Sequence, residues 1–573
     1  MTDGRIQRDA SALDGTYDVI VVGGGITGVN VAREFAGRGV TVLLVDKADF
    51  GQGTSSATTK YIHGGIRYLE TRQFGVVRES LRERRLLTLA APHLVSQRRF
   101  VMPAWRWSRP PTTLIGAGVG AYTALGFDRN RRLPSPLRTP LPRWWSRSRL
   151  LARVPWLDPA ELQGAFVYHD TLNEHPERLL LALLRTAVAS GATAVNHAEA
   201  TGFVVDRSAA GSITVTGVEL VDRQTGSTHR AMAKAVVNAA GPWMDLVLAR
   251  LGRPLGVALQ RSKGVHLLCR PIGGDAGEDT VFARARSGKN VIVSPWQGYH
   301  FIGPTDTAVE GSPDDVRAVA DDVDEILTIV NSTVAQPAQR LSLDDVADVT
   351  VGIRPLVMEE GKDTRSTSRR HELYHHARSG VHGLWSIAGG KWTTGRALGV
   401  ETATTVLGDP GLAGVRTRPY DSAATGVLHG FGWGADPAPL FEAALTSQPS
   451  VALDPPTRDH LARLYGTEYA AVLDLVAGDP SLGQRVSERP GCLDIAAQIV
   501  RAVTHEGAVE LSDIVDRRLT IGTLGPVGQR TLQRVASLAA PLLGWSAEQA
   551  TTRAEAEHLR RCTRRALWSP PHP

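Results

Sequence analysis

Near its start the chain carries an apolar pattern that predicts a strand, a turn, a helix and a second strand. Residues 19–22 are an unbroken run of β-branched residues, as expected for a strand that is buried on both faces. Glycines interrupt the pattern at 23–25, and a helix is expected after them. A second apolar run at 41–45 ends at Asp46. The first strand, the turn and the second strand therefore form one unit, around which the rest of the chain is organised.

The turn of this unit has the spacing of a nucleotide-binding motif. Gly23, Gly25 and Gly28 fit the pattern G-x-G-x-x-G. The first glycine allows the tight turn, the second lets the backbone approach a pyrophosphate, and the third lets the helix pack closely on the strand. The helix directs its N-terminal N–H groups and the positive end of its dipole at the phosphates. Asp46 stands where a ribose-binding carboxylate is expected, so we predict a dinucleotide site.

A glycine- and hydroxyl-rich loop over residues 47–70 follows the second strand. Loops at the carboxyl ends of parallel strands are where α/β sheets bind ligands. Hydroxyl side chains such as Thr54, Ser55 and Thr58 are expected to donate hydrogen bonds to a pyrophosphate or to ring oxygens. Gly64 would let the backbone lie against a flat ring. The alternative is a solvated loop without a ligand, which the position beside the dinucleotide fold disfavours.

The middle of the chain predicts a second, antiparallel layer. A helix is expected over 71–95, and residues 160–234 contain a helix and alternating segments that suit antiparallel strands. The buried strand 235–238 then returns to the first sheet, and the antiparallel layer continues over about 250–350. In this layer a hairpin is expected around Gln297–Gly298.

The last part of the chain is predicted to be helical. Residues 408–450 are rich in glycine, proline and alanine, as linkers are. Helical periodicity follows over 458–477, 493–505, 527–543 and 547–565. No chemistry is visible in this part, and its role stays open.

Length and composition set outer bounds on the protein. The chain has 573 residues, which favours two or three domains. The net charge of +6 mildly favours anionic partners. The three cysteines are too widely spaced to form a metal or disulfide pattern, which suits a reducing cytosol. We expect neither a signal peptide nor a spanning helix, because the N-terminus is polar and no apolar run reaches about 20 residues.

Motifs spread along the chain resemble those of one enzyme family. The first part carries GGGITG, TSSATTKYIHGGIRYLE and APHLV, and the middle carries VVNAAGPW, SKGVHLL, SPWQGYHFIGPTD, VGIRPL and SIAGGKWTT. In this order they resemble the FAD-dependent glycerol-3-phosphate dehydrogenases over roughly residues 17–400. The resemblance implies FAD as the cofactor and oxidation of sn-glycerol 3-phosphate to dihydroxyacetone phosphate. Electrons would pass to a membrane quinone or, in oxidase relatives, to oxygen.

The implied fold is an α/β, two-dinucleotide-binding-domain flavoprotein. It combines a Rossmann-like FAD domain, an antiparallel-sheet substrate domain and a C-terminal helical domain. The expected boundaries are a tail at 1–16, an oxidoreductase region at 17–408, a linker at 409–450 and the helical domain at 451–573. Within the oxidoreductase region, the FAD domain covers about 17–97, 235–250 and 380–408, and the substrate domain covers about 98–234 and 251–379.

The resemblance and the loop positions together give a set of candidate site residues. The candidate cofactor residues are Gly23, Gly24, Gly25, Thr27, Gly28, Asp46, Lys47, Thr54, Ser55, Thr58, Lys60, Tyr61, Ile62, His63, Ala239, Gly241, Gly390, Lys391, Trp392 and Thr393. The helix that starts at Thr393 is expected to direct its N-terminus at the flavin's pyrimidine edge, where negative charge grows on reduction. No metal ligand is predicted.

The candidate catalytic residues are histidines and an arginine. His63 and His266 are the candidate bases, since histidine titrates near working pH; for each, a structural role is the alternative. Arg354 is expected to bind the substrate or to stabilise a developing alkoxide. The cations expected to hold the substrate phosphate are Arg67, Arg354, Arg369 and Lys391.

A basic segment over residues 98–153 is the candidate for membrane contact. It holds twelve arginines, with Asp128 as its one acid and with tryptophans interleaved. An anionic membrane surface favours this combination. The alternative is a basic lid whose tryptophans lie in the core. We expect a cytoplasmic protein that is peripherally attached to the cytoplasmic membrane and uses its quinone. No nucleic-acid motif is recognised, and a homodimer stays open.

Two other classes of protein stay open. An amino-acid- or sarcosine-oxidase-like flavoenzyme shares the fold but needs a carboxylate clamp and, in covalent members, a cysteine near the flavin. The cysteines of this chain lie outside the flavin-contacting motifs. A non-catalytic nucleotide-binding protein would not need the cations beside the loop.

Overall fold

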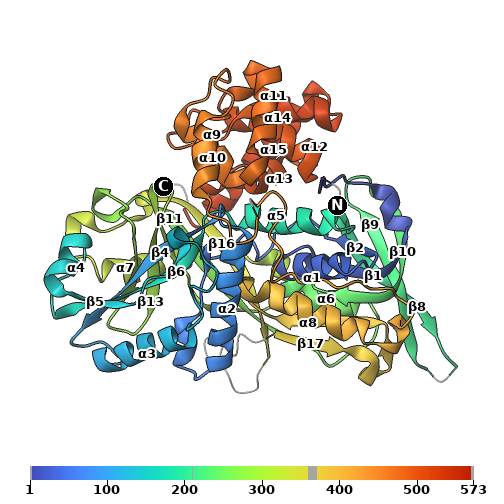
Figure 1. Cartoon of the computed structure of the whole chain (residues 1–573), viewed down its shortest axis with the longest axis horizontal. Coiled ribbons are helices and arrows are strands. Elements are labelled where there is room, and N and C mark those ends of the chain that lie inside the picture. Colours follow the sequence, from blue (N-terminus) through green and yellow to red (C-terminus); the bar gives the residue numbers. More distant parts are fainter. Residues whose placement is uncertain (1–2, 210, 359–370, 431, 570–573) are drawn as a thin grey trace.

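The computed structural model describes residues 3–209, 211–358, 371–430 and 432–569. Two lobes, each built on one large sheet, lie side by side, and the C-terminal helices pack on top of them (Figure 1). The predicted fold class is confirmed: a Rossmann-like sheet, a largely antiparallel second sheet and a helical C-terminal domain are all present.

The first sheet is the nucleotide-binding sheet, with strand order β17-β19-β10-β1-β2-β7. The five strands from β19 to β7 pair in parallel, as buried α/β sheets do, and β17 pairs antiparallel with β19 at the opposite end of this order. The bounds are β1 Thr16–Val22, β2 Val42–Val45, β7 Thr193–Val195, β10 Thr228–Asn238, β19 Leu384–Gly389 and β17 His371–His375.

Helices cover one face of this sheet, and a small antiparallel layer covers the other. The helices are α1 (Ile26–Gly37), α5 (Pro176–Ala189) and α8 (Gly395–Leu407), and their apolar sides share one core with β1 and β2. A second core on the opposite face includes residues of β8 (Ala198–Arg207) and β9 (Ile213–Asp222).

The assignment of residues 193–234 to the substrate layer was wrong. Strands β7 to β10 all belong to the nucleotide-binding sheet. The reason is the length of β10: residues 228–232 pair antiparallel with β9, and residues 232–238 pair in parallel with β1. One strand therefore serves both the antiparallel layer and the parallel core.

The second sheet has the order β15-β11-β14-β13-β12-β4-β6-β3, with β16 beside β11 and β5 beside β6. The expected hairpin is present, because β13 and β14 meet at Gln297 and Gly298, both with positive φ. The bounds are β3 Tyr61–Ile62, β4 Val95–Trp105, β5 Arg143–Ser146, β6 Leu162–Asn173, β11 Leu259–Cys269, β12 Asp279–Arg284, β13 Asn290–Trp296, β14 Tyr299–Gly303, β15 Thr307–Val309 and β16 Val346–Val357.

The basic segment forms the outer part of this second lobe. Its helices are α3 (Thr112–Leu125) and α4 (Arg147–Arg153), and α2 (Phe74–Ala90) lies beside α3. Only Val119 and Tyr122 of α3 are buried. Among the tryptophans, Trp105 and Trp145 are core residues, whereas Trp144 is 42% exposed. Trp145 therefore cannot contact a membrane, and Trp144 can.

The C-terminal part forms its own helical domain above both lobes (Figure 1). The predicted helix 458–477 is two helices, because Gly466 adopts a positive φ of 58° between them. A short helix, α9, lies inside the predicted linker. The bounds are α9 Ala438–Thr446, α10 Pro455–Tyr465, α11 Tyr469–Gly478, α12 Ala496–Glu506, α13 Leu511–Asp513, α14 Gln529–Leu543 and α15 Ala547–Ala566. No helix among the described residues combines the length and apolarity that crossing a bilayer requires.

Candidate functional site

A cavity of about 1740 Å³ is lined by residues of both sheets. At one end it is lined by the glycine turn after β1 and the end of β2, and farther along by β11, β14 and β16 of the second sheet. Its volume exceeds the range of about 300–1,000 Å³ that is typical of drug-sized ligand sites. The cavity is therefore large enough for an extended dinucleotide together with a small substrate.

The glycine turn has the geometry that close approach of a phosphate requires. A Cβ on Gly28 would lie 1.8 Å from the carbonyl oxygen of Gly23, so any side chain there would push α1 off the strand. Gly23 has a φ of +107°, and its Cβ would lie 2.6 Å from the carbonyl oxygen of Ala239. Gly25 lines the cavity at the N-terminus of α1. The turn thus fits the pyrophosphate of a dinucleotide.

Asp46 lies at the end of β2 and lines the cavity. Its carboxylate accepts hydrogen bonds from the backbone N–H of Gly24 (2.7 Å) and of Ala48 (2.8 Å). Burial raises the pKa of Asp46 to about 6, although these two donors oppose the shift. The carboxylate therefore ties the glycine turn to the end of β2 while it faces the cavity.

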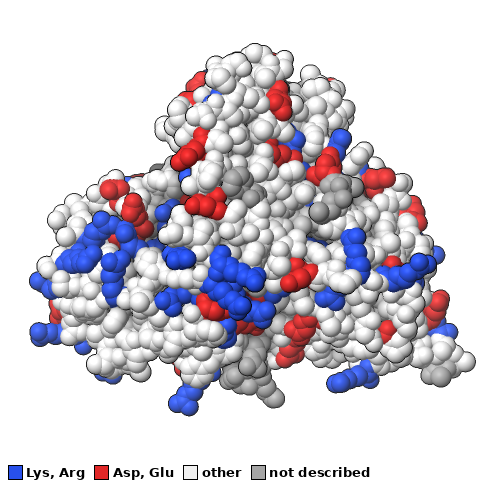
Figure 2. Space-filling view, in the orientation of Figure 1, with Lys and Arg blue, Asp and Glu red and all other residues white. Residues whose placement is uncertain are grey.

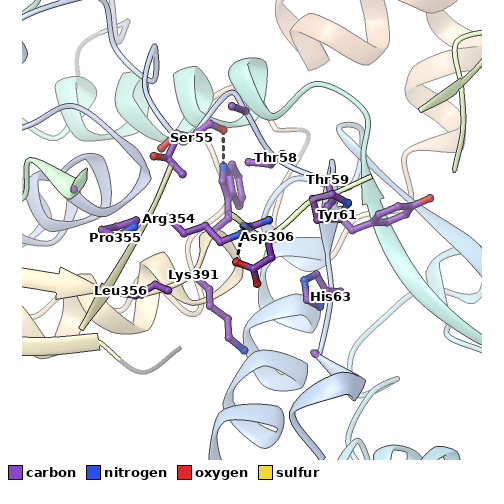
Figure 3. A pocket seen from close by; sticks show the side chains of 18 of the residues that line it. Ser55, Thr58, Thr59, Tyr61, His63, Asp306, Arg354, Pro355, Leu356 and Lys391 are labelled. Atoms are coloured by element: carbon purple, nitrogen blue, oxygen red, sulfur yellow. Dashed lines mark hydrogen bonds and ion pairs between the residues drawn. The ribbon is translucent and has the colours of Figure 1, made fainter. Parts of the chain in front are cut away.

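The hydroxyl-rich loop is held in place from three directions. Ser55 Oγ accepts a hydrogen bond from the backbone N–H of Ile26 at the start of α1 (2.9 Å). The carbonyl oxygen of Ser55 accepts one from Trp392 Nε1 (3.2 Å; Figure 3). Thr54 Oγ1 donates to the carbonyl oxygen of Ile353 in β16 (2.6 Å). These contacts join the loop to α1, to the segment before α8 and to the second sheet.

Most of the candidate cofactor residues line the cavity, and five do not. The lining residues are Gly23, Gly25, Thr27, Asp46, Lys47, Thr54, Ser55, Thr58, Tyr61, His63, Ala239, Gly241, Gly390, Lys391 and Trp392. Those outside the lining are Gly24, Gly28, Lys60, Ile62 and Thr393. Gly24 and Gly28 shape the turn from behind, and Ile62 is a core residue. Lys60 has a positive φ of 61°, and its buried ammonium lies 4.4 Å from the ring centroid of Trp296.

His63 lies on the cavity wall, beside the cations expected to bind phosphate. Burial lowers the pKa of His63 to about 4; the carboxylate of Asp170 opposes the shift, and the charges of Lys391 and Arg67 add to it. Lys391 donates from Nζ to Ser80 Oγ of α2 (2.9 Å). His63 is therefore neutral near pH 7 and able to accept a proton.

His266, on β11, lines another part of the same cavity. It is 4% exposed, and its ring stacks on Phe301. Neither ring nitrogen has a hydrogen-bond partner among the described residues. Burial lowers the pKa of His266 to about 3, and the charges of Arg354 and Lys60 add to the shift. A buried, neutral imidazole that faces a cavity can accept a hydrogen bond from a ligand hydroxyl.

Arg354, on β16, directs its guanidinium at Asp306 (Figure 3). Its guanidinium donates to the carbonyl oxygen of Thr305 (3.0 Å) and to Ser262 Oγ (3.1 Å), and lies 3.6 Å from a carboxylate oxygen of Asp306. The predicted cation cluster thus has two parts along one cavity: Arg354 beside His266, and Lys391 with Arg67 beside His63. Arg369 lies outside the described residues.

Sequence reasoning missed a buried acid whose charge acts on His63 and which also lines the cavity. Asp170, on β6, is 1% exposed and accepts hydrogen bonds from Tyr122 of α3 (2.8 Å) and from Arg84 of α2. It also accepts a weaker one from the backbone N–H of Gly64 (3.3 Å). Asp170 belongs to none of the motifs quoted above. The one signal in the sequence is an acidic residue within the largely apolar strand β6.

Comparison with known proteins supports the assignment of the cavity to a dinucleotide cofactor. The model of the family "FAD dependent oxidoreductase" matches residues 18–396, and "C-terminal domain of alpha-glycerophosphate oxidase" matches residues 431–550. A glycerol-3-phosphate dehydrogenase of Synechocystis sp. is 34% identical over 95% of this chain and 96% of its own length. An aerobic glycerol-3-phosphate dehydrogenase of Staphylococcus saprophyticus is 28% identical over 90% of this chain and 88% of its own.

A solved structure agrees over nearly the whole length. The glycerol-3-phosphate dehydrogenase of Bacillus halodurans, solved with FAD, superposes with a TM-score of 0.76 at 26% identity and covers 98% of this chain and 97% of its own. The expected cofactor, FAD, is confirmed by the family match and agrees with the cavity geometry. The chain therefore belongs to the FAD-dependent oxidoreductases and, within them, to the glycerol-3-phosphate dehydrogenase family.

Proposed function

We propose that this protein oxidises sn-glycerol 3-phosphate to dihydroxyacetone phosphate. The observation that carries the proposal is the placement of three cations, Arg67, Arg354 and Lys391, and of two neutral histidines along one cavity. A phosphate monoester needs cations, and removal of the C2 hydroxyl proton needs a neutral base. Both are present in one cavity of a chain whose family acts on this substrate.

In the proposed reaction the chain's own residues bind the substrate and move one proton. Lys391 and Arg67 hold the phosphate, and Arg354 stabilises negative charge that develops on the C2 oxygen. His266 or His63 takes the proton of the C2 hydroxyl. Bound FAD would supply the two-electron acceptor, and its N5 would be the atom that takes the hydride leaving C2. The balance is closed: one proton goes to the histidine, and one hydride leaves C2 as the ketone forms.

We assign the binding of FAD to residues that are far apart in the chain, in the first 60 residues and near residue 390. We propose that the glycine turn and Asp46 hold the ADP part, and that Ser55, Thr58 and Trp392 flank the flavin. All of them line the cavity. The loop contacts to α1, β16 and Trp392 fix these residues before a ligand arrives, which lowers the entropy cost of binding.

We also propose that electrons leave to a membrane quinone, and that α3 contacts the bilayer. Leu114 on α3 is 59% exposed and Phe127 just after it is 75% exposed, and Leu114 also lines the cavity. The exposed arginines of the same segment are Arg106, Arg109, Arg131, Arg132, Arg138, Arg143, Arg147, Arg149 and Arg153. Figure 2 shows basic side chains gathered on this lobe. Apolar residues flanked by arginines suit an anionic membrane surface.

A substrate panel tests the proposed activity. Purified protein with FAD is supplied with a soluble dye as electron acceptor and with glycerol 3-phosphate, glycerol or glycine. We expect turnover with glycerol 3-phosphate and little with glycerol, because the phosphate is the group the cations bind. Turnover with glycine in place of glycerol 3-phosphate would support the amino-acid oxidase alternative. Oxygen uptake in place of dye reduction would identify an oxidase.

A further inference from the structure

The loop that lines the FAD cavity is also held from its other side by the C-terminal domain. Asp46, Lys47 and residues 51–55 line the cavity, whereas Asp49, in the same loop, does not. Asp49 is 0% exposed. Its carboxylate receives hydrogen bonds from Arg517 and Arg518, which belong to the helical domain. The wall of the cofactor cavity and the C-terminal domain therefore meet at one buried carboxylate.

The carboxylate of Asp49 accepts four hydrogen bonds, three of them from arginine side chains. Arg518 donates to both carboxylate oxygens (2.7 and 2.9 Å), and Arg517 donates through Nε (2.5 Å). Asn196 donates to Oδ1 (2.9 Å). Burial alone would raise the pKa of Asp49, but the charges of Arg518 and Arg517 outweigh it and hold the pKa well below its usual range. An ionised carboxylate in this position costs much free energy if either arginine is lost.

The two arginines are themselves fixed by the helical domain. Arg518 donates from Nε (3.0 Å) and Nη2 (2.9 Å) to the carbonyl oxygen of Glu506 at the end of α12. Arg517 donates to Asp513 (2.9 Å). Both arginines lie in a π-helical turn, residues 514–518, a rare geometry that often marks functional sites. The arginines are thus oriented before they meet the loop.

A second contact reaches the same loop through the turn between β7 and β8. His197 donates its backbone N–H to the carbonyl oxygen of Ala48 (3.0 Å), and its Nε2 lies 3.0 Å from a carboxylate oxygen of Asp513. Asn196 donates to the carbonyl oxygen of Gly507 as well as to Asp49. The C-terminal domain therefore holds Asp49 directly and through Asn196, and it holds Ala48 through His197.

We propose that the C-terminal helical domain acts as a clamp that fixes the cavity wall at residues 46–55 and so sets how tightly FAD is retained. Asp49, Arg517 and Arg518 are positioning residues in this clamp and touch no reacting atom. The proposal gives a role to a domain in which the sequence shows no chemistry. It rests on FAD as the cofactor and is independent of the substrate.

The test compares two isosteric replacements at one interface. Asp49→Asn removes the charge from the clamp. Glu506→Gln is the matched control: Glu506 is also 0% exposed, and its side chain is bound by both terminal nitrogens of Arg178 on α5 (2.8 and 2.9 Å) and not by Arg517 or Arg518. The change keeps the backbone carbonyl of Glu506 that accepts from Arg518. For each variant, apoprotein is titrated with FAD, FAD release is followed after dilution, and unfolding by urea is measured in parallel.

We expect Asp49→Asn to bind FAD about tenfold more weakly, or worse, the scale of one lost charge-assisted hydrogen bond. Glu506→Gln should bind FAD as the unchanged protein does, even at a similar loss of resistance to urea. Amide hydrogen exchange over residues 47–56 should rise in Asp49→Asn alone. At saturating FAD, the KM for the substrate should be unchanged in both variants.

Arg518→Lys keeps the positive charge but removes the guanidinium that donates to both oxygens of Asp49. This variant replaces Asp49→Asn in the experiment if Asp49→Asn does not fold. We expect it to weaken FAD binding by a smaller factor. Equal weakening of FAD binding in Glu506→Gln would overturn the proposal, because the domain would then act through overall stability. Unchanged FAD affinity in both Asp49→Asn and Arg518→Lys would overturn it as well. The FAD-binding, urea and hydrogen-exchange readouts need no glycerol 3-phosphate, so failure of the clamp and failure of the proposed reaction are distinguishable.

Discussion

The imidazole of His266 stacks on the ring of Phe301, with centroids 4.8 Å apart and planes 7° from parallel. The stack fixes the plane of the imidazole, and the ring nitrogens have no partner among the described residues. The ammonium of Lys60 lies 5.7 Å from the same phenyl centroid. This arrangement holds a neutral histidine at the cavity wall, with its hydrogen-bonding capacity left for a ligand.

The first prediction concerns the two histidines. Replacing the one that acts as base by Asn should slow flavin reduction by glycerol 3-phosphate about 10²–10⁴-fold, the usual contribution of a general base. The other replacement should cost far less. His300→Asn is the control, because His300 is buried but accepts and donates through backbone groups of Ile272 and Ala276. Anaerobic rapid mixing measures the rate. Normal reduction in the double variant His63→Asn, His266→Asn would rule out a histidine base.

The second prediction concerns pH. The pKa values of His63 (about 4) and His266 (about 3) are lowered mainly by burial, so either base stays neutral as pH falls below 6.5. An imidazole with a pKa of about 4 keeps roughly nine-tenths of its neutral form at pH 5, whereas an ordinary one keeps about 3%. The free substrate phosphate itself has a second pKa of about 6, so the test uses kcat, which reports the bound complex. We expect kcat to change little between pH 6.5 and 5. A fall with an apparent pKa near that of free imidazole would contradict a buried histidine base.

The lowered histidine pKa values also affect the free energy of unfolding, which they reduce at acid pH. The unfolded chain binds protons at these histidines below about pH 6.5, and the folded chain does so only near the lowered pKa values. Stability should therefore fall as pH drops from 6.5 towards 4. The pH profile has to be recorded with a check that the protein stays folded at each pH.

The third prediction concerns the glycine turn. Gly28→Ala places a methyl group 1.8 Å from the carbonyl oxygen of Gly23, so α1 must shift and FAD binding should be lost. Gly120→Ala on α3 is the matched control, since a Cβ there meets nothing within 4 Å. This control should gain up to about 1 kcal/mol in free energy of unfolding. Measured FAD content and urea unfolding separate the two, and full FAD occupancy in Gly28→Ala would refute the assignment of the turn.

The fourth prediction concerns the membrane. The protein should bind anionic liposomes, and binding should weaken without vanishing as salt rises. Leu114→Ser with Phe127→Ser should remove mainly the salt-resistant part, and Arg147→Glu with Arg149→Glu mainly the salt-sensitive part, because each arginine near an anionic surface contributes about 1 kcal/mol. Quinone-linked turnover should fall in both variants, while turnover with a soluble dye should persist.

Controls for the membrane experiment lie in the C-terminal domain. Arg530→Glu with Arg534→Glu on α14, and Leu559→Ser on α15, change exposed residues of the same types away from α3. These variants should bind liposomes as the unchanged protein does. If the unchanged protein ignores anionic liposomes at low salt, the basic segment is a lid and the membrane proposal fails.

Local patterns predicted much of the cofactor end of the site. The β-branched run of β1, the spacing of Gly23, Gly25 and Gly28, and Asp46 at the end of β2 each follow from steric or hydrogen-bonding rules that act within a few residues. The histidines were identified by residue type and by the motifs around them. Their neutral state was not, because it depends on burial by strands that are distant in the sequence.

The contacts that sequence reasoning missed are long-range. Asp49 and Arg517 are 468 residues apart, and no periodicity links them. The double pairing of β10 likewise depends on which strands flank it in space. Lys60 sits in a motif of lining residues, yet its positive φ places its ammonium over Trp296 and outside the lining. Tertiary packing decides each of these cases.

The most direct test of the proposed oxidation of glycerol 3-phosphate is an anaerobic titration of the FAD-loaded protein with this substrate. The account predicts that substrate abolishes the yellow absorbance of oxidised flavin and that one dihydroxyacetone phosphate forms for each flavin reduced. Glycine, proline and unphosphorylated glycerol should leave the absorbance unchanged at the same concentration. Persistence of the oxidised spectrum with glycerol 3-phosphate, together with its loss on addition of an amino acid, would contradict the account.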